Sequence, residues 1–213
     1  ISGKSMWLNG FHRWMLGMVA QWLGYPARCA NALAPILISA EQGMCKSTFC
    51  SILLPEELRG YYTDKFAITS TSGCEQKIST FGLINMDEFD MYNERMMTIL
   101  KNLMQMKKVN YRKCFKAYFS DLPRIASFIG TSNEKSLLTD ETGSRRFLCI
   151  EVEKPIDCSP IDYTQLYAQL KWELEAGKRY WLSKEEEKEI QEHNRAFYRH
   201  SPEEEAFYKV FAL

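Results

Sequence analysis

The first segment of the chain has the apolar spacing of an amphipathic helix, with apolar residues at positions 7, 8, 11, 14, 15, 18, 19 and 22. Apolar runs typical of strands buried in a parallel sheet follow at 34–39 and 81–86, and two further strand candidates lie at 124–133 and 145–152. Helical patterns lie between or after these runs, at 46–54, 93–106, 163–176, 183–198 and from 202 onward. This alternation predicts an α/β fold with a parallel sheet flanked by helices.

We expect three parts along the chain: an N-terminal helical segment at 1–30, a core at 31–155 and a C-terminal helical segment at 156–213. The chain starts at Ile1 rather than at methionine, and its last residues have the pattern of a helix. We therefore expect a fragment of a longer polypeptide, in which the C-terminal segment leads to a downstream domain.

Polar side chains follow three of the predicted strands. The first strand leads into "AEQGMCKST" (40–48), the second into "DEFD" (87–90), and the third ends in "TSN" (131–133). In a parallel α/β sheet, ligands bind at the carboxyl ends of the strands. The three segments are therefore expected to form one site.

The stretch at 40–48 resembles the phosphate-binding loop G-x-x-x-x-G-K-[ST], with Ala40 and Cys45 in place of its two glycines. Lys46 is placed to reach the β and γ phosphates of a nucleotide, and Ser47 to bind Mg²⁺. A non-glycine residue in a strained backbone conformation costs about 1–3 kcal/mol, or about tenfold to hundredfold in affinity. A retired loop or a coincidental match is the alternative. Because the chemical groups are retained, we interpret the loop as modified and working, with candidate nucleotide-binding residues Gly43, Cys45, Lys46, Ser47 and Thr48.

Polar residues at the other strand ends supply the remaining chemistry. Asp87 is suited to bind a metal ion, and Glu88 to orient or deprotonate an attacking water. Asn133 has an amide that can position the same water, while Arg145 and Arg146 suit bidentate phosphate contacts. The alternatives are a solvated acidic turn, an ordinary asparagine in a turn and a surface ion pair.

The order of "QGMCKSTF", "LINMDEFD", "RIASFIGTSN" and "LLTDETGSRRF" resembles the virulence-associated E proteins of bacterial mobile elements and phages, over about residues 34–152. Those are P-loop ATPases related to superfamily 3 helicases and to the AAA+ group. The resemblance implies a P-loop NTPase fold with ATP and Mg²⁺ as cofactors. It assigns Lys46 and Ser47 to Walker A, Asp87 and Glu88 to Walker B, Asn133 to sensor 1, and Arg145–Arg146 to the arginine-finger region. Ala40 and Cys45 depart from the usual pattern.

A basic segment precedes the third strand. Residues 95–120 contain no acidic residue and seven basic ones, Arg95, Lys101, Lys107, Lys108, Arg112, Lys113 and Lys116. The later ones alternate with Tyr111, Phe115, Tyr118 and Phe119. Cations beside aromatic rings are typical of surfaces that bind single-stranded nucleic acid, and the resembling helicases carry a DNA-binding hairpin at this place. The candidate DNA-binding residues are Lys107, Lys108, Arg112, Lys113 and Lys116; a hairpin with a solvated basic face is the alternative.

Composition limits the classes of function. The formal net charge is zero, so DNA binding must come from a local patch. The seven cysteines form no C-x-x-C pair, which argues against a zinc site. The apolar run at 14–24 is too short to span a membrane and contains Gln21. With no signal peptide, reduced thiols in a cytoplasmic protein are the simplest interpretation.

Together these patterns predict an ATP-dependent DNA helicase or translocase module of a mobile-element or phage replication protein. We expect it to act on single-stranded or forked DNA as a homo-oligomer, a hexameric ring, with one of the two arginines reaching a neighbour's nucleotide. The main alternative is a degenerate P-loop scaffold that binds DNA or a partner with little hydrolysis. A small-molecule kinase is less favoured, because no substrate pocket is evident in the sequence.

Overall fold

The structure, a computed structural model, describes residues 5–25, 29–68, 71–111, 120–140 and 143–199. Its centre is a sheet of five parallel strands in the order β2-β3-β6-β1-β7. These strands are β1 (Ala34–Ile38), β2 (Tyr62–Thr63), β3 (Leu83–Met86), β6 (Ser127–Ser132) and β7 (Phe147–Glu151). Because all five run in the same direction, their carboxyl ends lie along one edge of the sheet and their amino ends along the other.

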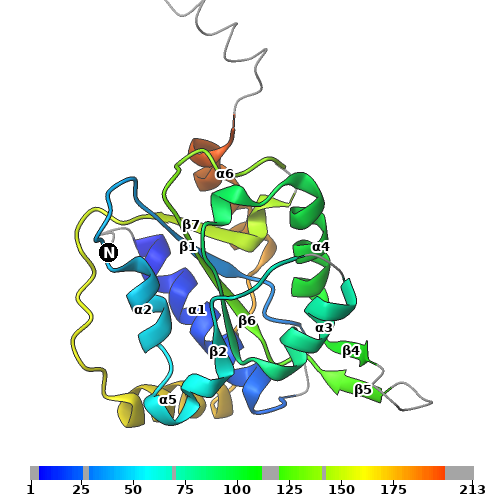
Figure 1. Cartoon of the computed structure of the whole chain (residues 1–213). Coiled ribbons are helices and arrows are strands. Elements are labelled where there is room, and N and C mark those ends of the chain that lie inside the picture. The colour runs from blue at the N-terminus through cyan, green and yellow to red at the C-terminus, as the bar shows by residue number, and fades with distance from the viewer. Residues whose placement is uncertain (1–4, 26–28, 69–70, 112–119, 141–142, 200–213) are drawn as a thin grey trace, which may run out of the picture.

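Helices cover both faces of the sheet (Figure 1). They are α1 (Ser5–Trp22), α2 (Lys46–Ile52), α3 (Thr71–Thr80), α4 (Glu94–Gln105), α5 (Tyr163–Glu175) and α6 (Lys184–Asn194). Four short 3-10 helices join them: η1 (Glu56–Tyr61), η2 (Phe89–Met91), η3 (Ser144–Arg146) and η4 (Arg195–Phe197). A separate hairpin of β4 (Lys108–Tyr111) and β5 (Ser120–Pro123) projects beside α3 in Figure 1.

Alternating side chains of the buried strands divide the apolar interior into two cores. Ile36 and Ile38 of β1 point toward α3 and α4, whereas Leu37 between them points toward α1, α2 and α5. All five residues of β1 are buried, as are all six of β6. These strands therefore have continuous apolar or small side chains instead of an apolar–polar alternation.

A buried arginine fixes the base of the hairpin. Arg124 is 3% exposed, and burial lowers its pKa to about 9. Its guanidinium donates to the carbonyl oxygens of Leu103 and Met104 at the end of α4, at 3.2 and 2.9 Å. It also donates to Gln21 Oε1 of α1 at 2.5 Å and to the Asn31 carbonyl oxygen at 2.9 Å. One side chain thus joins the hairpin, α4, α1 and the segment before β1.

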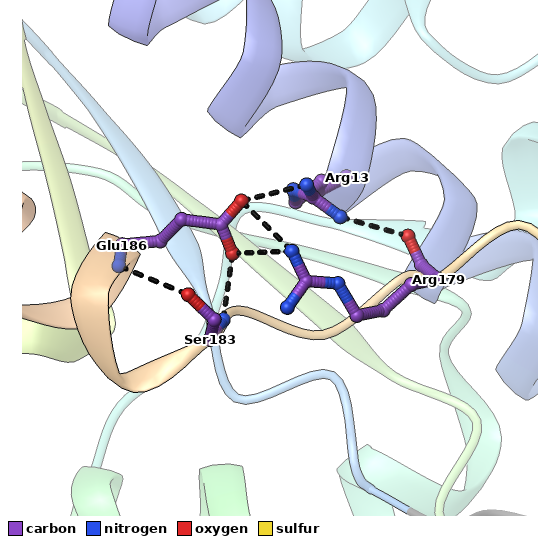
Figure 2. Close-up of polar contacts among 4 residues, drawn as sticks. All are labelled: Arg13, Arg179, Ser183 and Glu186. Atoms are coloured by element: carbon purple, nitrogen blue, oxygen red, sulfur yellow. Dashed lines mark hydrogen bonds and ion pairs between the residues drawn. The ribbon is translucent and has the colours of Figure 1, made fainter.

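The amino end of α6 is attached to α1 through one carboxylate, as Figure 2 shows. Glu186 and Ser183 form a capping box at the start of α6. Glu186 Oε1 accepts from Arg13 of α1 at 2.6 Å and from Arg179 at 3.0 Å. The Arg13 guanidinium also donates to the Arg179 carbonyl oxygen at 3.0 Å. These contacts fix the segment before α6 against α1.

The predicted α/β fold with a parallel sheet is confirmed, and several boundaries need correction. The strand expected at 124–133 begins at Ser127, because Arg124 is turned into the network described above. The strand expected at 145–152 begins at Phe147, and Arg145 and Arg146 belong to η3. The helix expected at 183–198 ends at Asn194, and the one from 202 onward lies outside the described residues.

Strand β2 and helix α3 have no counterpart among the predicted elements. Throughout the described ranges, none of the helices combines the length and apolar character that crossing a membrane requires.

The Arg124 network generates a stability prediction. Replacing Arg124 with methionine removes the guanidinium donors of the Met104 and Asn31 carbonyl oxygens in the protein interior, so the free energy of unfolding should fall by about 3 kcal/mol. Arg195→Met is the matched control, because that side chain is 74% exposed and its removal should change stability by less than about 0.5 kcal/mol. Urea denaturation of both variants measures the difference. Equal stability of Arg124→Met and the parent protein would show that the network contributes nothing.

Candidate nucleotide site at the carboxyl edge of the sheet

Three strand ends meet at one edge of the sheet, and Lys46 joins two of them. Its Nζ donates to the carbonyl oxygen of Ser39, just after β1, at 2.7 Å. The same atom donates to Asn133 Oδ1, just after β6, at 3.0 Å. Partial burial lowers the pKa of the Lys46 ammonium, while the carboxylates of Asp87 and Asp90 act in the opposite sense. The ammonium group therefore lies among the polar ends of the strands, where the sequence predicts it.

The third strand end contributes Asp87, which follows β3. Ser47 Oγ donates to Asp87 Oδ1 at 3.1 Å, and the Thr131 hydroxyl donates to the same oxygen. Mg²⁺ is commonly bound by one or two carboxylates together with substrate phosphates, so one hydroxyl beside one carboxylate suits this ion. Thr48 is exposed on the next position of α2. The structure thus brings Lys46, Ser47, Asp87 and Asn133 together.

The loop before α2 is held near its carboxyl end by a backbone contact with a distant segment. Met44 is 4% exposed, and its carbonyl oxygen accepts from the backbone N–H of Ile156 at 3.2 Å. Gly43 has a φ of 76°, and a Cβ there would meet no atom within 4 Å. Its backbone conformation, more than lack of space, favours glycine at this position.

Two residues of the site have an unusual backbone conformation. Within the described ranges, Cys45 and Glu88 are the only non-glycine residues with positive φ, at 58° and 51°. Cys45 immediately precedes Lys46, and Glu88 immediately follows Asp87. Left-handed conformations of residues with a Cβ cost energy and cluster at functional sites. The expected strain at Cys45 is present, and Glu88 shares it.

Asp90 belongs to the site and was missed as a candidate by the sequence analysis. Its Oδ1 accepts from Ser132 Oγ at 2.7 Å and lies 3.4 Å from the backbone nitrogen of Asn133. Asp90 therefore positions the chain that carries the Asn133 amide. Asp90 stands three residues after Asp87 in "DEFD", but nothing local in the sequence indicates its contact with Ser132.

A broad surface groove opens beside the acidic pair. It has a volume of about 490 Å³, and its lining includes Asp87 and Glu88, with Phe66 and Tyr92 among the other lining residues. Both carboxylates are exposed, so Glu88 is accessible to solvent and to a ligand.

The two arginines lie at the other edge of the sheet. Phe147, which follows Arg146, pairs with Ala34 at the amino end of β1. Five residues at about 3.3 Å each place about 16 Å between the two ends of this strand. Arg145 ion-pairs with Glu187 at 3.4 Å. The predicted arginine pair is therefore apart from Lys46 of the same chain.

Asn194 of α6, which has no local signal in the sequence, holds the turn at 143–147 that carries Arg145 and Arg146, called the arginine turn below. This side chain is fully buried, and its Nδ2 donates to the carbonyl oxygens of Ser144 and Phe147, both at 2.8 Å. The bonds bracket η3 on both sides of the arginines. They explain why Arg145 and Arg146 lie in a turn before β7 and not in the strand.

The predicted DNA-binding residues are only partly described. Lys107 and Lys108 are exposed where the chain enters β4. Arg112, Lys113 and Lys116 lie outside the described residues. The expected hairpin is present as β4 and β5.

Two solved structures share the fold. The A form apo structure of the NrS-1 C-terminal region has a TM-score of 0.50 and 15% identity, covering 91% of this chain and 39% of that one. Another apo structure of the NrS-1 C-terminal region has a TM-score of 0.50 and 17% identity, covering 95% of this chain and 47% of that one. This chain thus spans less than half the length of either structure. No curated protein matches it significantly.

The family is shown by a sequence profile. The profile of the virulence-associated protein E-like domain matches residues 5–199. This range includes both cores, the arginine turn and the Lys46 cluster, which is formed by Lys46, Ser47, Asp87 and Asn133. The family predicted from the four motifs is confirmed, and the chain belongs to the virulence-associated protein E-like domain family.

Proposed function

We propose that this domain binds and hydrolyses ATP and uses the reaction to move or unwind DNA, in the replication of a mobile element or phage. The observation that carries the proposal is the meeting of Lys46, Ser47, Asp87 and Asn133 at one sheet edge. Each is a residue type that phosphoryl-transfer sites use. Lys46 and Ser47 begin α2, whereas Asp87 follows β3 and Asn133 follows β6.

The contacts of Lys46 leave it able to bind a phosphate. An ammonium group has three donors, and Ser39 and Asn133 accept two of them. The third is available for an oxygen of the β or γ phosphate. Asn133 Oδ1 lies 3.0 Å from the same ammonium group, so with ATP bound its amide would be close enough to orient a water molecule near the terminal phosphate.

Ser47 and Asp87 are the residues that would hold Mg²⁺. The ion, when bound with ATP, neutralises charge on the β and γ phosphates. Asp87 is already oriented by Ser47 and Thr131, so its carboxylate needs little reorganisation. Glu88 is exposed beside it and acts as the base that accepts a proton from the attacking water.

The geometry at Cys45 favours a working loop over a retired one. Cys45 adopts a φ of 58° and ψ of 24°, a conformation that glycine would take with less strain. A protein without selection on this loop would be expected to lose such a strained turn or the polar groups around it. Here the turn is retained together with the mutual hydrogen bonds of Lys46, Asn133, Ser47 and Asp87.

The position of the arginines supports action on a second subunit. They lie at the amino edge of the sheet, while the Lys46 cluster lies at the carboxyl edge. Because the Lys46 cluster of the same chain lies about a strand length away, we infer that the arginines act on a nucleotide held by a neighbouring chain. Repetition of this contact generates a ring when the rotation closes, and we propose a hexamer.

The first prediction of the proposed function concerns catalysis. Lys46→Ala should lower steady-state ATPase activity by roughly 10²-fold or more, because it removes the charge that stabilises the transferring phosphoryl group. Glu88→Gln should lower turnover by about 10²–10⁴ and leave ATP binding intact, because the amide cannot accept the proton. Lys171→Ala on exposed α5 is the control and should be unchanged. Normal turnover in Lys46→Ala, or an inactive parent protein with and without single-stranded DNA, would contradict the proposal.

The second prediction concerns DNA. Replacing Lys107 and Lys108 with glutamine should weaken binding to single-stranded DNA and reduce the slope of log affinity against log salt by about 1.4. The physical reason is that two fewer counterions are displaced from the phosphates. Fluorescence anisotropy at several salt concentrations measures the slope, with Lys171→Gln/Lys184→Gln as a charge-matched control. An unchanged slope would show that Lys107 and Lys108 do not contact DNA phosphates and only form a solvated basic face.

The third prediction concerns assembly. Lys46→Ala and Arg146→Ala should each be inactive, and mixing them should restore ATPase activity, because some interfaces then contain an intact loop and an intact arginine. A working arginine contributes about 10³–10⁵ in rate, so recovery is easily measured. The same mixture with Arg145→Ala compares the two arginines. Absence of recovery in assemblies shown to be mixed would refute action between subunits.

A further inference from the structure

Two cysteines from distant parts of the chain lie against one another beside the loop before α2. Cys45 ends that loop, and Cys158 lies in the segment that joins β7 to α5. The backbone N–H of Ile156 donates to the Met44 carbonyl oxygen at 3.2 Å, which brings the two stretches together. The thiol groups of Cys45 and Cys158 share a hydrogen bond, so their sulfur atoms are in contact. Both side chains pack against the core that lies toward α1, α2 and α5.

The segment that carries Cys158 is fixed on both sides of it. In Figure 1 this segment runs from β7 past α2 to α5. At its start, the backbone N–H of Val152 donates to the Ile38 carbonyl oxygen at 2.8 Å. At its end, the Tyr163 hydroxyl donates to the Ile52 carbonyl oxygen at the end of α2, at 2.6 Å. The contact between the two thiols is therefore part of a fixed arrangement of α2 and this segment.

Accessibility separates this pair from the other cysteines that the structure describes. Three of those are buried: Cys50, Cys74 and Cys149. Burial raises the pKa of each of these three thiols, so little reactive thiolate forms. Cys29 is partly exposed, but it precedes β1 and so lies toward the amino edge of the sheet. Cys45 and Cys158 are both partly exposed, and they combine this exposure with mutual contact.

The backbone at Cys45 points to a task for its side chain. Its φ of 58° and ψ of 24° are values that glycine would adopt with less strain. Strained residues of this kind cluster at functional sites, where the strain is offset by what the residue does there. A thiol is what cysteine has and glycine lacks, and here that thiol meets a second one.

Two thiols in contact can take part in binding a metal ion or can be oxidised. A structural zinc site needs four ligands, and a catalytic one needs three from the protein. Among the residues that the structure describes, no three metal-binding side chains gather closely enough to hold an ion. Oxidation is therefore the chemistry that the pair supports.

We propose that Cys45 and Cys158 form a redox modification site, at which hydrogen peroxide converts the two thiols to a disulfide. The thiolate of Cys45 attacks one peroxide oxygen and becomes a sulfenic acid, while the other oxygen leaves as water. The sulfur of Cys158 then attacks the Cys45 sulfur and displaces its hydroxyl group as a second water. Two thiols are thereby oxidised, and one peroxide is reduced to two waters. Burial, and then Cys45 and Asp157, raise the pKa of Cys158, which assigns the first attack to Cys45.

The disulfide would restrain the loop before α2. Lys46 directly follows Cys45, and its ammonium group is held by Ser39 and Asn133. With Cys45 bonded to the segment after β7, the backbone between Gly43 and Lys46 could no longer adjust to a bound phosphate. Oxidation should therefore weaken nucleotide binding. This consequence rests on the proposed function, whereas formation of the bond does not.

Peptide mapping of the whole chain after treatment with hydrogen peroxide tests the bond. Mass spectrometry should find the Cys45 and Cys158 peptides linked, with the loss of two hydrogen atoms, and dithiothreitol should separate them. Cys158→Ser should give no link and should leave Cys45 as a sulfenic acid that dimedone traps. Cys29→Ser is the matched control, because that thiol is also partly exposed, and its link should form as in the parent. No link in folded parent protein, or a link between other cysteines instead, would overturn the proposal.

Hydrogen exchange of the peptide at 40–52 measures the restraint on the loop without any nucleotide. Oxidation of the parent should slow amide exchange severalfold, and peroxide-treated Cys158→Ser should exchange like the reduced parent. Because the bond closes a long stretch of chain, the urea midpoint of the oxidised parent should also rise. Equal exchange and equal midpoints of oxidised and reduced parent would show that the bond does not restrain the loop.

Titration with a fluorescent ATP analogue separates this inference from the proposed function. The oxidised parent should bind the analogue severalfold more weakly than the reduced parent, dithiothreitol should restore binding, and Cys158→Ser should not respond to peroxide. If no form binds the analogue while the mapped bond and slower exchange remain, the thiol pair stands and the proposed function falls. Binding by the reduced parent that peroxide leaves unchanged gives the reverse.

Discussion

The common direction of the five strands is the constraint on which the rest of the structure depends. It places the ends of β1, β3 and β6 at one edge, so Lys46, Asp87 and Asn133 meet although they are separated by more than forty residues each along the chain. The same direction places the arginine turn at the opposite edge, because that turn precedes its strand. The Lys46 cluster and the arginine turn of one chain are therefore separated by about the length of a strand.

Buried polar side chains fix the positions of these edges relative to the helices. Arg124 and Asn194 both donate to buried backbone carbonyl oxygens at the ends of other elements, Arg124 to Met104 in the last turn of α4 and Asn194 to Ser144 and Phe147 around the arginines. Both side chains are almost completely buried, so loss of either removes hydrogen-bond donors from the protein interior. Glu186 has a similar task at the surface, where one carboxylate joins α1 to the start of α6. Each links segments that are distant in the sequence, which apolar packing alone would position less specifically.

The sequence predicted those features that depend on local patterns. Continuous apolar runs identified β1, β3, β6 and β7, and the polar residues after three of them predicted the cluster at one edge. Strand β2 has only two residues, too few for any periodicity, and α3 has the sequence "TSGCEQKIST", with little apolar character. The position of Arg145 and Arg146 depends on Asn194, almost fifty residues later, and a contact over that separation has no local signature. The same is true of Asp90, whose role follows from its contact with Ser132.

Separation of the two edges has a consequence for assembly. Under the proposed function, the arginine turn of one chain meets the Lys46 cluster of the next, so different surfaces of the two chains form the contact. Such a heterologous interface cannot saturate in a dimer; it closes into a ring or continues as a filament. In an isolated chain the two arginines have no neighbour's phosphate, and Arg145 pairs instead with Glu187 of its own chain. Arrival of a phosphate would exchange that weak internal pair for stronger contacts, so nucleotide binding and subunit contact would stabilise one another.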